Sequence, residues 1–209
     1  MPLIAALPLI YFASVTPGMR TDIALPFFGT IHFATVYFYV IIPLLVMIVT
    51  NTVNQLGGLN GLETVCPAII MVGLMFLSGS HAILLVGPLI IWLVLAYFNL
   101  KGKIFVGNTG SFGIGMTLAA FAIISDLKVS LVISLVPYIL NSALVLLTYL
   151  FFKKKAQVAF DGHKLSADHR RSLITLVTYR RQFSERQVVA IIALAVAAST
   201  VIGCVVQLI

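Results

Sequence analysis

The chain has 209 residues, of which 61% are hydrophobic and 9% are charged. A water-soluble domain of this size cannot cover so much apolar surface, so the composition excludes that class and indicates an integral membrane protein. The formal net charge is +7 at pH 7. Because the basic residues lie between apolar runs, this charge indicates membrane orientation, and we expect no nucleic-acid partner.

Seven apolar segments follow one another along the chain, and each is expected to form a membrane-spanning helix. The predicted fold is therefore an all-α polytopic membrane protein, with a single transmembrane domain over residues 1–209. The expected spans cover residues 2–16, 33–53, 62–79, 82–99, 109–125, 129–152 and 187–208. The first is short for a span of roughly 20 residues, so we expect it either to cross with little tilt or to lack part of its beginning.

Two hairpins are predicted in the connecting segments. DIALPF and TIHFAT flank Phe28-Gly29, a pattern typical of a small β-hairpin at the membrane surface. The alternating residues QVAF are followed by Asp161-Gly162, which indicates a second short hairpin. The next apolar piece, LITLVTY, is predicted to be amphipathic and to lie at the membrane interface.

The distribution of Lys and Arg predicts which side each connecting segment faces. If the segments near 54–61, 100–108 and 153–186 share one side, that side carries eleven basic residues, and the other side keeps only Arg20 and Lys128. By the positive-inside rule the three segments are cytoplasmic, and the first β-hairpin is extracytoplasmic. Residues 153–186 are thus expected to form a basic cytoplasmic loop.

Polar residues interrupt the apolar pattern in the stretch NTVNQLGGLNGLE. Asn51 and Asn54 are three residues apart and share a helix face at its cytoplasmic end, where polar groups usually line a bundle interior or a wet cavity. Gly57-Gly58 is expected to end the helix and let the backbone approach a ligand. Asn60 is expected to cap the next helix, with Glu63 at its third position. Ordinary caps explain Asn60 and Glu63 but not the other four residues, which favours a functional site.

A second polar cluster begins the fifth apolar segment. The residues from Gly107 to Ser111 read GNTGS, and the free N–H groups of a helix N-terminus bind phosphate well. A plain N-cap at Asn108 or Ser111 explains the same residues, and the chemistry of the pattern leaves both interpretations open.

The run Lys153-Lys154-Lys155 also has two interpretations. Lysines directly after a span commonly determine topology, and a basic loop above a cytosolic cavity also suits a diphosphate ligand. The histidines and cysteines have no metal-ligand spacing.

TNTVNQLGGLNGLE, followed about forty residues later by IFVGNTGSFGIGMT, resembles the polyprenyl-phosphate N-acetylhexosamine-1-phosphate transferases. The likeness is greatest to the eukaryotic and archaeal branch, which uses UDP-GlcNAc and dolichyl phosphate. LIAALPLI, DGHKL and SER have counterparts there as well. The resemblance implies transfer of a sugar 1-phosphate from a UDP-sugar to a polyprenyl phosphate, with release of UMP and with Mg²⁺ on the diphosphate. It also implies a location in the cell membrane of a prokaryote or in the endoplasmic reticulum.

The resemblance assigns roles to individual residues. It implies that Asn54 lies at the metal, that Asn60 reads the uracil edge, that Phe105 stacks on uracil and that Gly58 belongs to the nucleotide pocket. It places the lysines Lys153, Lys154 and Lys155 where the family contacts the diphosphate and the sugar.

Two departures from the family pattern bear on activity. Asn108 stands where the family normally has an aspartate that binds Mg²⁺, and a neutral carboxamide should weaken that binding. Glu63 is the one cytosolic acid expected near these motifs. The aspartate-rich motif of the family has no counterpart here, so the catalytic residues stay unassigned. Family members normally have about ten spans, and we expect this chain to need an N-terminal fragment or a homodimer partner.

Three hypotheses follow for the chain. The first is the C-terminal part of a transferase, and the second is a non-catalytic relative that binds UDP-sugar or partners another subunit. The third, a transporter, is disfavoured because the polar residues gather on one side, with none in mid-membrane to form a pathway.

Overall fold

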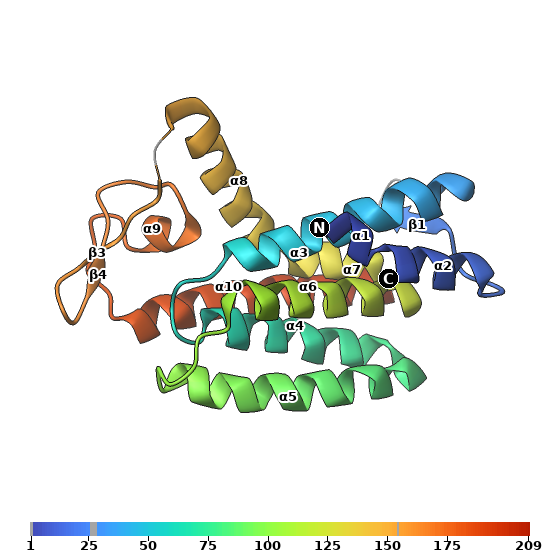
Figure 1. The fold of residues 1–209 in the computed structure, drawn as a ribbon, viewed down its shortest axis with the longest axis horizontal. Helices are drawn as coiled ribbons and strands as arrows, with labels where there is room; N and C mark the ends of the chain where they lie inside the picture. Colours follow the sequence, from blue (N-terminus) through green and yellow to red (C-terminus); the bar gives the residue numbers. More distant parts are fainter. Residues whose placement is uncertain (1, 26–28, 154) are drawn as a thin grey trace.

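A computed structural model describes residues 2–25, 29–153 and 155–209, most of which are helical (Figure 1). The helices are α1 (Pro2–Ala5), α2 (Leu7–Val15), α3 (Ile42–Gln55), α4 (Leu62–Leu77), α5 (Ile83–Leu100), α6 (Gly107–Ile124), α7 (Lys128–Ser134), α8 (Val136–Phe152), α9 (Leu173–Val177) and α10 (Glu185–Leu208). A π-helical turn, η1 (Tyr37–Ile41), precedes α3, and a 3-10 turn, η2 (Gly79–Ala82), precedes α5. The strands are β1 (Asp22–Leu25), β2 (Gly29–His32), β3 (Ala159–Phe160) and β4 (Leu165–Ser166).

All seven predicted apolar segments contain helices. Among the described residues, four helices are long and apolar enough to cross a membrane: Tyr37–Gln55, Gly79–Leu100, Gly107–Ile124 and Glu185–Leu208. The pair α7 and α8 makes a fifth candidate span, bent by 58° at its break. Pro137 in the first turn of α8 explains the break, because proline has no N–H to donate to the preceding turn. The apolar helices Leu3–Val15 and Leu62–Leu77 are shorter. The chain is an integral, multi-pass membrane protein of predominantly helical structure.

Close backbone contacts hold the helices of the bundle together. α3 packs on α6, while α10 packs on α4 and α7 (Figure 1). A Cβ atom added at Gly115 of α6 would lie 2.8 Å from the Cα atom of Thr50 in α3. Small residues permit this approach, which stabilises helix pairs in a membrane through van der Waals packing. The hydroxyl of Ser199 in α10 donates to the carbonyl of Ser134 in α7 at 3.0 Å.

The first predicted hairpin is present and lies at one end of the bundle. β1 and β2 are antiparallel, with Asp22 opposite His32 and Leu25 opposite Gly29. The predicted turn residue Phe28 lies outside the described residues. The hairpin completes an end of the molecule that is distant from the polar motifs (Figure 1).

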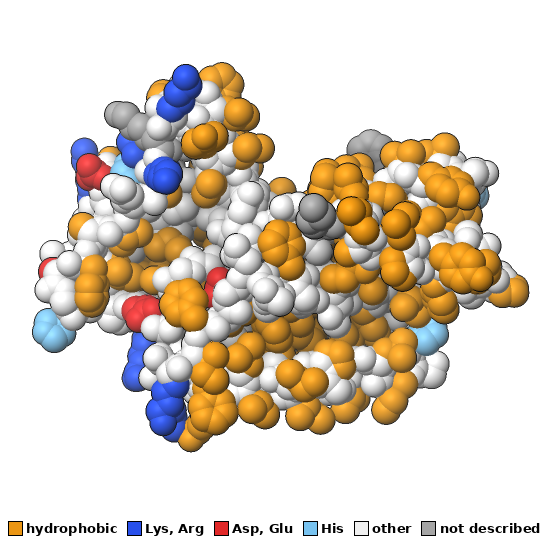
Figure 2. Space-filling model, in the orientation of Figure 1, with side chains coloured by type: hydrophobic (Ala, Val, Ile, Leu, Met, Phe, Trp, Pro, Cys, Tyr) orange, Lys and Arg blue, Asp and Glu red, His pale blue; other side chains and the backbone are white. Residues whose placement is uncertain are grey.

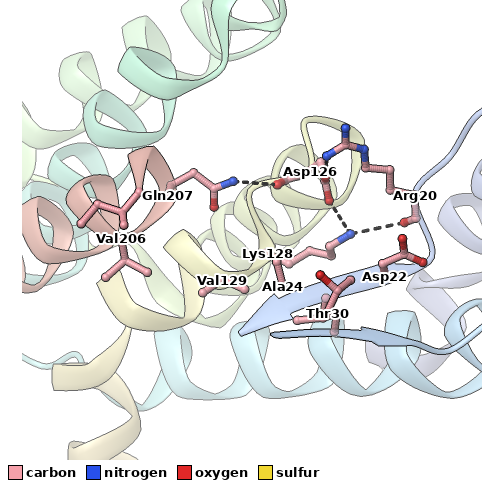
Figure 3. A pocket seen from close by; sticks show the side chains of 11 residues that line it. Arg20, Asp22, Ala24, Thr30, Asp126, Lys128, Val129, Val206 and Gln207 are labelled. Atoms are coloured by element: carbon pink, nitrogen blue, oxygen red, sulfur yellow. Dashed lines mark hydrogen bonds and ion pairs between the residues drawn. The ribbon is translucent and has the colours of Figure 1, made fainter. Parts of the chain in front are cut away.

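An ion pair with a buried lysine connects the segment before this hairpin to the turn between α6 and α7 (Figure 3). The side chain of Lys128 is 5% exposed, and its ammonium group lies 2.6 Å from the carboxylate of Asp126. It also donates to the carbonyl of Arg20 at 3.3 Å and sits over the ring of Tyr37. Arg20 and Lys128, the two basic residues predicted to share a side, are thus found together. These partners offset the cost of removing the ammonium group from water.

The segments at the opposite end form a small layer beside the bundle (Figure 1). β3 and β4 pair antiparallel, so the second predicted hairpin is confirmed. In its turn the carboxylate of Asp161 accepts from the backbone N–H groups of His163 and Lys164 at 2.9 and 2.6 Å. These bonds lower the pKa of Asp161, because they favour its charged form. The predicted interfacial piece forms α9, which packs on α8 and α10.

Candidate functional site

The two polar motifs meet where α3 ends and α6 begins. The hydroxyl of Ser111 donates to the side-chain oxygen of Asn54 at 2.5 Å and also lies 3.1 Å from the carbonyl of Asn108. Asn54 is half-buried, and Asn108 is exposed in the first turn of α6. The structure therefore brings the predicted metal residues Asn54 and Asn108 to the same helix junction, with Ser111 between their segments.

The N-cap interpretation of the second motif is wrong for both of its candidates. α6 begins at Gly107, and its N-cap is Val106, which makes no side-chain capping bond. Asn108 and Ser111 lie inside the helix, and Ser111 donates its hydroxyl instead of accepting from a backbone N–H. The first N–H groups of this helix thus receive no side-chain cap from the N-cap residue.

The first asparagine of the NTVNQLGG stretch has a local role. The side-chain amide of Asn51 donates to the carbonyl of Met47, one turn earlier in α3, at 2.7 Å. Asn51 and Asn54 do share a helix, but only Asn54 reaches the second motif. Asn51 is satisfied by its own helix, a bond that carries no ligand specificity.

The two glycines, Gly57 and Gly58, have different surroundings. α3 ends at Gln55, and its C-cap Leu56 directly precedes the two glycines, so the helix ends at the glycines as predicted. A side chain at Gly57 would collide with the carboxylate of Glu63, so Gly57 makes room for Glu63. Gly58 has a φ of +93° and is exposed, with no atom within 4 Å of an added Cβ. Of the two, only Gly58 leaves its backbone open to a ligand.

The prediction that Asn60 caps α4 is wrong. α4 begins at Leu62, its N-cap is Gly61 with a φ of 97°, and Glu63 is its second residue instead of its third. A side chain of another helix bonds this N-cap residue. The side-chain oxygen of Asn99, in the last turn of α5, accepts from the N–H of Gly61 at 2.7 Å.

Asn99 was not singled out from the sequence, yet it joins the two motifs. Its side chain is buried, and its amide nitrogen donates to the carbonyl of Ile104 at 2.9 Å. Its oxygen also lies 3.3 Å from the hydroxyl of Thr64. The signal that could have identified Asn99 is a carboxamide at the end of the otherwise apolar run LIIWLVLAYFNL, where a polar side chain is costly to bury without a partner.

A second acid lies at the first motif. The carboxylate of Glu185, at the start of α10, accepts from the backbone N–H of Asn60 at 2.6 Å. The expectation that Glu63 is the one acid near these motifs is therefore wrong. Sequence spacing did not indicate Glu185, because 125 residues separate it from Asn60. Glu185 and Asn99 fix the Asn60-Gly61 turn from two sides, which leaves the side chain of Asn60 outside these backbone bonds.

The predicted stacking residue lies in the loop that Asn99 holds. Phe105 directly follows Ile104 and is 71% exposed. A Cβ added at Gly102, in the same loop, would lie 3.9 Å from the side-chain nitrogen of Asn60. Asn60 and the loop of Phe105 are therefore neighbours at the same end of the bundle, with an aromatic ring exposed beside them.

The basic run lies at the far end of α8, which projects away from the bundle (Figure 1). Lys153 and Lys155 are exposed, while Lys154 lies outside the described residues. Basic side chains gather on this tip and the adjoining loop (Figure 2). Arg171, in the same loop, donates to the carbonyl of Lys155 at 3.2 Å. Lys153 and Lys155 lie at the motif-bearing end of the chain, and among the described residues neither bonds Asn54 or Asn108.

The residues at the junction do not by themselves complete a magnesium site. Asn54 and Asn108 offer neutral carboxamide oxygens, whereas Mg²⁺ prefers hard, anionic oxygens in octahedral geometry. In residues 2–25, 29–153 and 155–209, no group of three or more His, Cys, Asp or Glu side chains lies together in a metal-binding arrangement. The junction therefore holds two candidate ligands and needs anionic oxygens from elsewhere.

Comparison with known proteins identifies the family. The model of glycosyl transferase family 4 matches residues 1–126. The chain belongs to glycosyl transferase family 4. The match includes both polar motifs, so Asn54, Asn60, Asn99, Phe105 and Asn108 all lie inside the segment that carries the family pattern.

Several relatives of this family 4 chain come from archaea and bacteria. Two share the name "Putative UDP-N-acetylglucosamine--dolichyl-phosphate N-acetylglucosaminephosphotransferase". The one from Saccharolobus solfataricus is 30% identical over 200 residues, which are 92% of this chain and 61% of the relative. The one from Sulfolobus acidocaldarius is 27% identical over 172 residues, 78% of this chain and 48% of the relative.

A bacterial relative, the phospho-N-acetylmuramoyl-pentapeptide-transferase of Streptococcus thermophilus, is 28% identical over 164 residues, 75% of this chain and 47% of that protein. The family 4 chain thus aligns with between 47% and 61% of the length of these relatives.

Proposed function

We propose that this chain takes part in the transfer of GlcNAc 1-phosphate from UDP-GlcNAc to a polyprenyl or dolichyl phosphate, with release of UMP. This reaction initiates synthesis of a lipid-linked glycan. The observation that carries the proposal is the pair of bonds made by Asn99. Its carboxamide bonds both the turn after Asn60 and the loop before Phe105. The Asn54–Ser111 contact lies at the same end of the bundle.

The uridine is recognised by Phe105, Asn60 and Gly58. The exposed ring of Phe105 offers a face on which a base stacks. The carboxamide of Asn60 has one acceptor and two donors, and it matches the acceptor and donor edge of uracil. Gly58 leaves backbone accessible next to it. The bond from Asn60 N–H to Glu185 holds the turn in place for this contact.

The diphosphate lies at the start of α6. This helix has 18 residues, and its N-cap makes no side-chain bond, so its first N–H groups are free to bind phosphate oxygens. Lys153, Lys154 and Lys155 supply positive charge from the basic loop. Cationic groups near a diphosphate offset the charge that develops as the leaving group departs.

The reaction forms one bond and breaks one. A phosphate oxygen of the lipid attacks the phosphorus that carries the sugar, and a new P–O–P linkage forms. The bond from that phosphorus to the oxygen of UMP breaks, and UMP leaves with the electron pair. This chain's residues bind and orient the donor in this scheme, and no described side chain is assigned as a catalytic residue.

Magnesium binds with the donor in this proposal. The diphosphate supplies anionic oxygens, and Asn54 and Asn108 supply neutral ones. The two carboxamides alone do not hold the metal.

The topology of the proposal places the reaction at the cytoplasmic surface. The chain makes seven spans, with the motif end and the loop 153–186 in the cytoplasm and the hairpin 22–32 outside. The relatives are longer than the part that this chain matches. The full reaction is therefore proposed for this chain together with a segment equivalent to their remaining part, or with a second copy of this chain.

The neutral donor set favours one alternative, a non-catalytic relative that binds UDP-sugar or another subunit. A bound nucleotide without turnover is its expected behaviour, because the pocket of Asn60 and Phe105 does not depend on the charge at Asn108. Binding and catalysis are thus separable by experiment.

The test measures Mg²⁺-dependent UMP release from UDP-GlcNAc and a polyprenyl phosphate, with the purified chain in lipid nanodiscs. The assay is run with and without a co-expressed segment equivalent to the remaining part of the Saccharolobus solfataricus relative. Turnover that needs both substrates supports the transferase. Uridine nucleotide binding without UMP release under any condition favours the non-catalytic alternative, and absence of both contradicts the proposal.

A further inference from the structure

Asn141 is a buried carboxamide in the second turn of α8, and the functional motifs do not include it. Its side chain is 1% exposed. Its amide nitrogen donates to the carbonyl of Gln55 at 3.1 Å, and its side-chain oxygen accepts from the N–H of Leu173 at 2.9 Å. One side chain thus bonds two backbone groups that are far apart in sequence.

Both partners of Asn141 are groups that a helix leaves without an internal bond. Gln55 is the last residue of α3, and Leu173 is the first residue of α9. The last carbonyls and the first N–H groups of a helix need partners from outside it. Asn141 therefore joins the end of one helix to the start of another, while it belongs to a third.

These two ends lie next to the two halves of the proposed donor site. Gln55 directly follows Asn54, whose side chain contacts Ser111 at the start of α6. Leu173 closely follows Arg170 and Arg171 in the basic loop, and Arg171 bonds the carbonyl of Lys155. The hydrogen bonds of Asn141 thus connect the segment of Asn54 to the basic loop.

The bend at the base of α8 takes its far end away from α3. α8 leaves the bundle at 58° to α7, and its far end projects from the molecule (Figure 1). The basic loop is attached to that end and, through α9, to α10, which packs mainly on α4 and α7. The hydrogen bonds of Asn141 add a direct attachment to the end of α3, near the base of α8 where the helix is still buried.

We infer that Asn141 is a positioning residue. Through α9, it holds the basic loop at a fixed position relative to the end of α3. The loop and the contact between Asn54 and Ser111 then face one diphosphate. This inference rests on the proposed function for its ligand. Its structural part, the attachment of α9 to α3, is independent of any activity.

The experiment compares three variants in nanodiscs. Asn141→Leu keeps the branched shape and the four heavy atoms of the side chain and removes both hydrogen bonds. Asn141→Asp keeps an oxygen for the N–H of Leu173 and loses the amide donor to Gln55. Ser142→Ala is the matched control, because Ser142 is the next residue of the same helix and its buried hydroxyl has no hydrogen-bond partner among the described residues.

The first readout is amide hydrogen exchange of residues 173–177. We expect exchange there to rise roughly tenfold in Asn141→Leu, to rise less in Asn141→Asp and to stay at the wild-type rate in Ser142→Ala. Exchange in α10 should stay unchanged, which shows that the bundle is folded. Unchanged exchange of α9 in Asn141→Leu, or an equal rise in Ser142→Ala, overturns the inference. If Asn141→Leu does not fold, Asn141→Asp decides by the same criterion.

The second readout is binding of UMP and of UDP-GlcNAc. UMP has no second phosphate, so we expect its Kd to change little in Asn141→Leu, while the Kd of UDP-GlcNAc rises about tenfold. An equal change for both ligands contradicts the positioning role. If the wild-type chain binds neither ligand, the proposed function fails while the exchange result still decides whether Asn141 positions the loop.

Discussion

The side-chain oxygen of Asn99 lies 2.7 Å from the backbone nitrogen of Gly61, although 38 residues separate them. The same carboxamide bonds the carbonyl of Ile104, so a single side chain at the end of α5 sets the relative position of the two family motifs. The arrangement leaves Asn60 and Phe105 on neighbouring segments at one end of the bundle.

Asn99→Leu should destabilise the protein and weaken nucleotide binding together. The substitution leaves the N–H of Gly61 and the carbonyl of Ile104 without their partner, which costs about 1–3 kcal/mol. Thermal unfolding in detergent and titration with UMP measure the two effects. Tyr97→Phe is the control, because it removes an exposed hydroxyl from the same helix and should change neither quantity. Wild-type UMP affinity in folded Asn99→Leu would contradict the linking role.

Phe105→Ala should weaken uridine binding with little loss of stability. The ring is exposed, so its removal creates no cavity, while loss of base stacking costs about 1–3 kcal/mol of binding free energy. Calorimetric titration with UMP measures the effect, and Ile104→Ala, which keeps the backbone carbonyl that Asn99 bonds, is the control. The pocket is misplaced if Phe105→Ala and Asn60→Ala both bind UMP as tightly as the wild type does.

Asn108→Asp should strengthen magnesium binding in the presence of UDP-GlcNAc. It replaces a neutral oxygen by a carboxylate at the exposed start of α6, where the helix dipole also favours negative charge. Titration with Mn²⁺ as a paramagnetic probe should give a Kd at least about tenfold lower. Asn51→Asp is the matched control, since Asn51 bonds its own helix. An unchanged metal affinity would remove Asn108 from the metal site.

Gly115→Val should force α3 and α6 apart. The added side chain meets the backbone of Thr50, and overpacking of this kind costs about 1–3 kcal/mol. The melting temperature in detergent should fall accordingly. Gly113→Val lies two residues away on the exposed side of the same helix, where an added Cβ meets no atom within 4 Å, and it should melt close to the wild type.

The turn of the β3–β4 hairpin should loosen in acid. Backbone N–H groups hold the pKa of Asp161 below its ordinary value of 3.8. Its contribution is therefore present above the unfolded-state pKa and is lost as the pH falls through the lower, folded-state pKa. The amide resonances of His163 and Lys164 should shift over that acidic range in the wild type. Asp161→Asn should show no such titration, and an identical titration in both proteins would refute the assignment.

The sequence by itself determined the elements of this protein. Runs of apolar residues predicted helices at all seven places. A membrane span must form its backbone hydrogen bonds within itself, and an apolar run is recognised from neighbouring residues alone. Asp161-Gly162 predicted its hairpin for the same reason, since a turn is specified by adjacent residues. The motif pattern also indicated the family, because the unusual residues stand close together in the chain.

Only the tertiary structure decided which polar groups satisfy one another. Asn99 bonds the N–H of the residue before α4, Glu185 reaches the first motif from α10, and Asn141 joins α3 to α9. In each case a backbone group at or next to a helix end takes its partner from a different helix. Which helix ends meet depends on how the apolar faces of the helices pack. The spacing of residues along the chain does not indicate which faces contact one another.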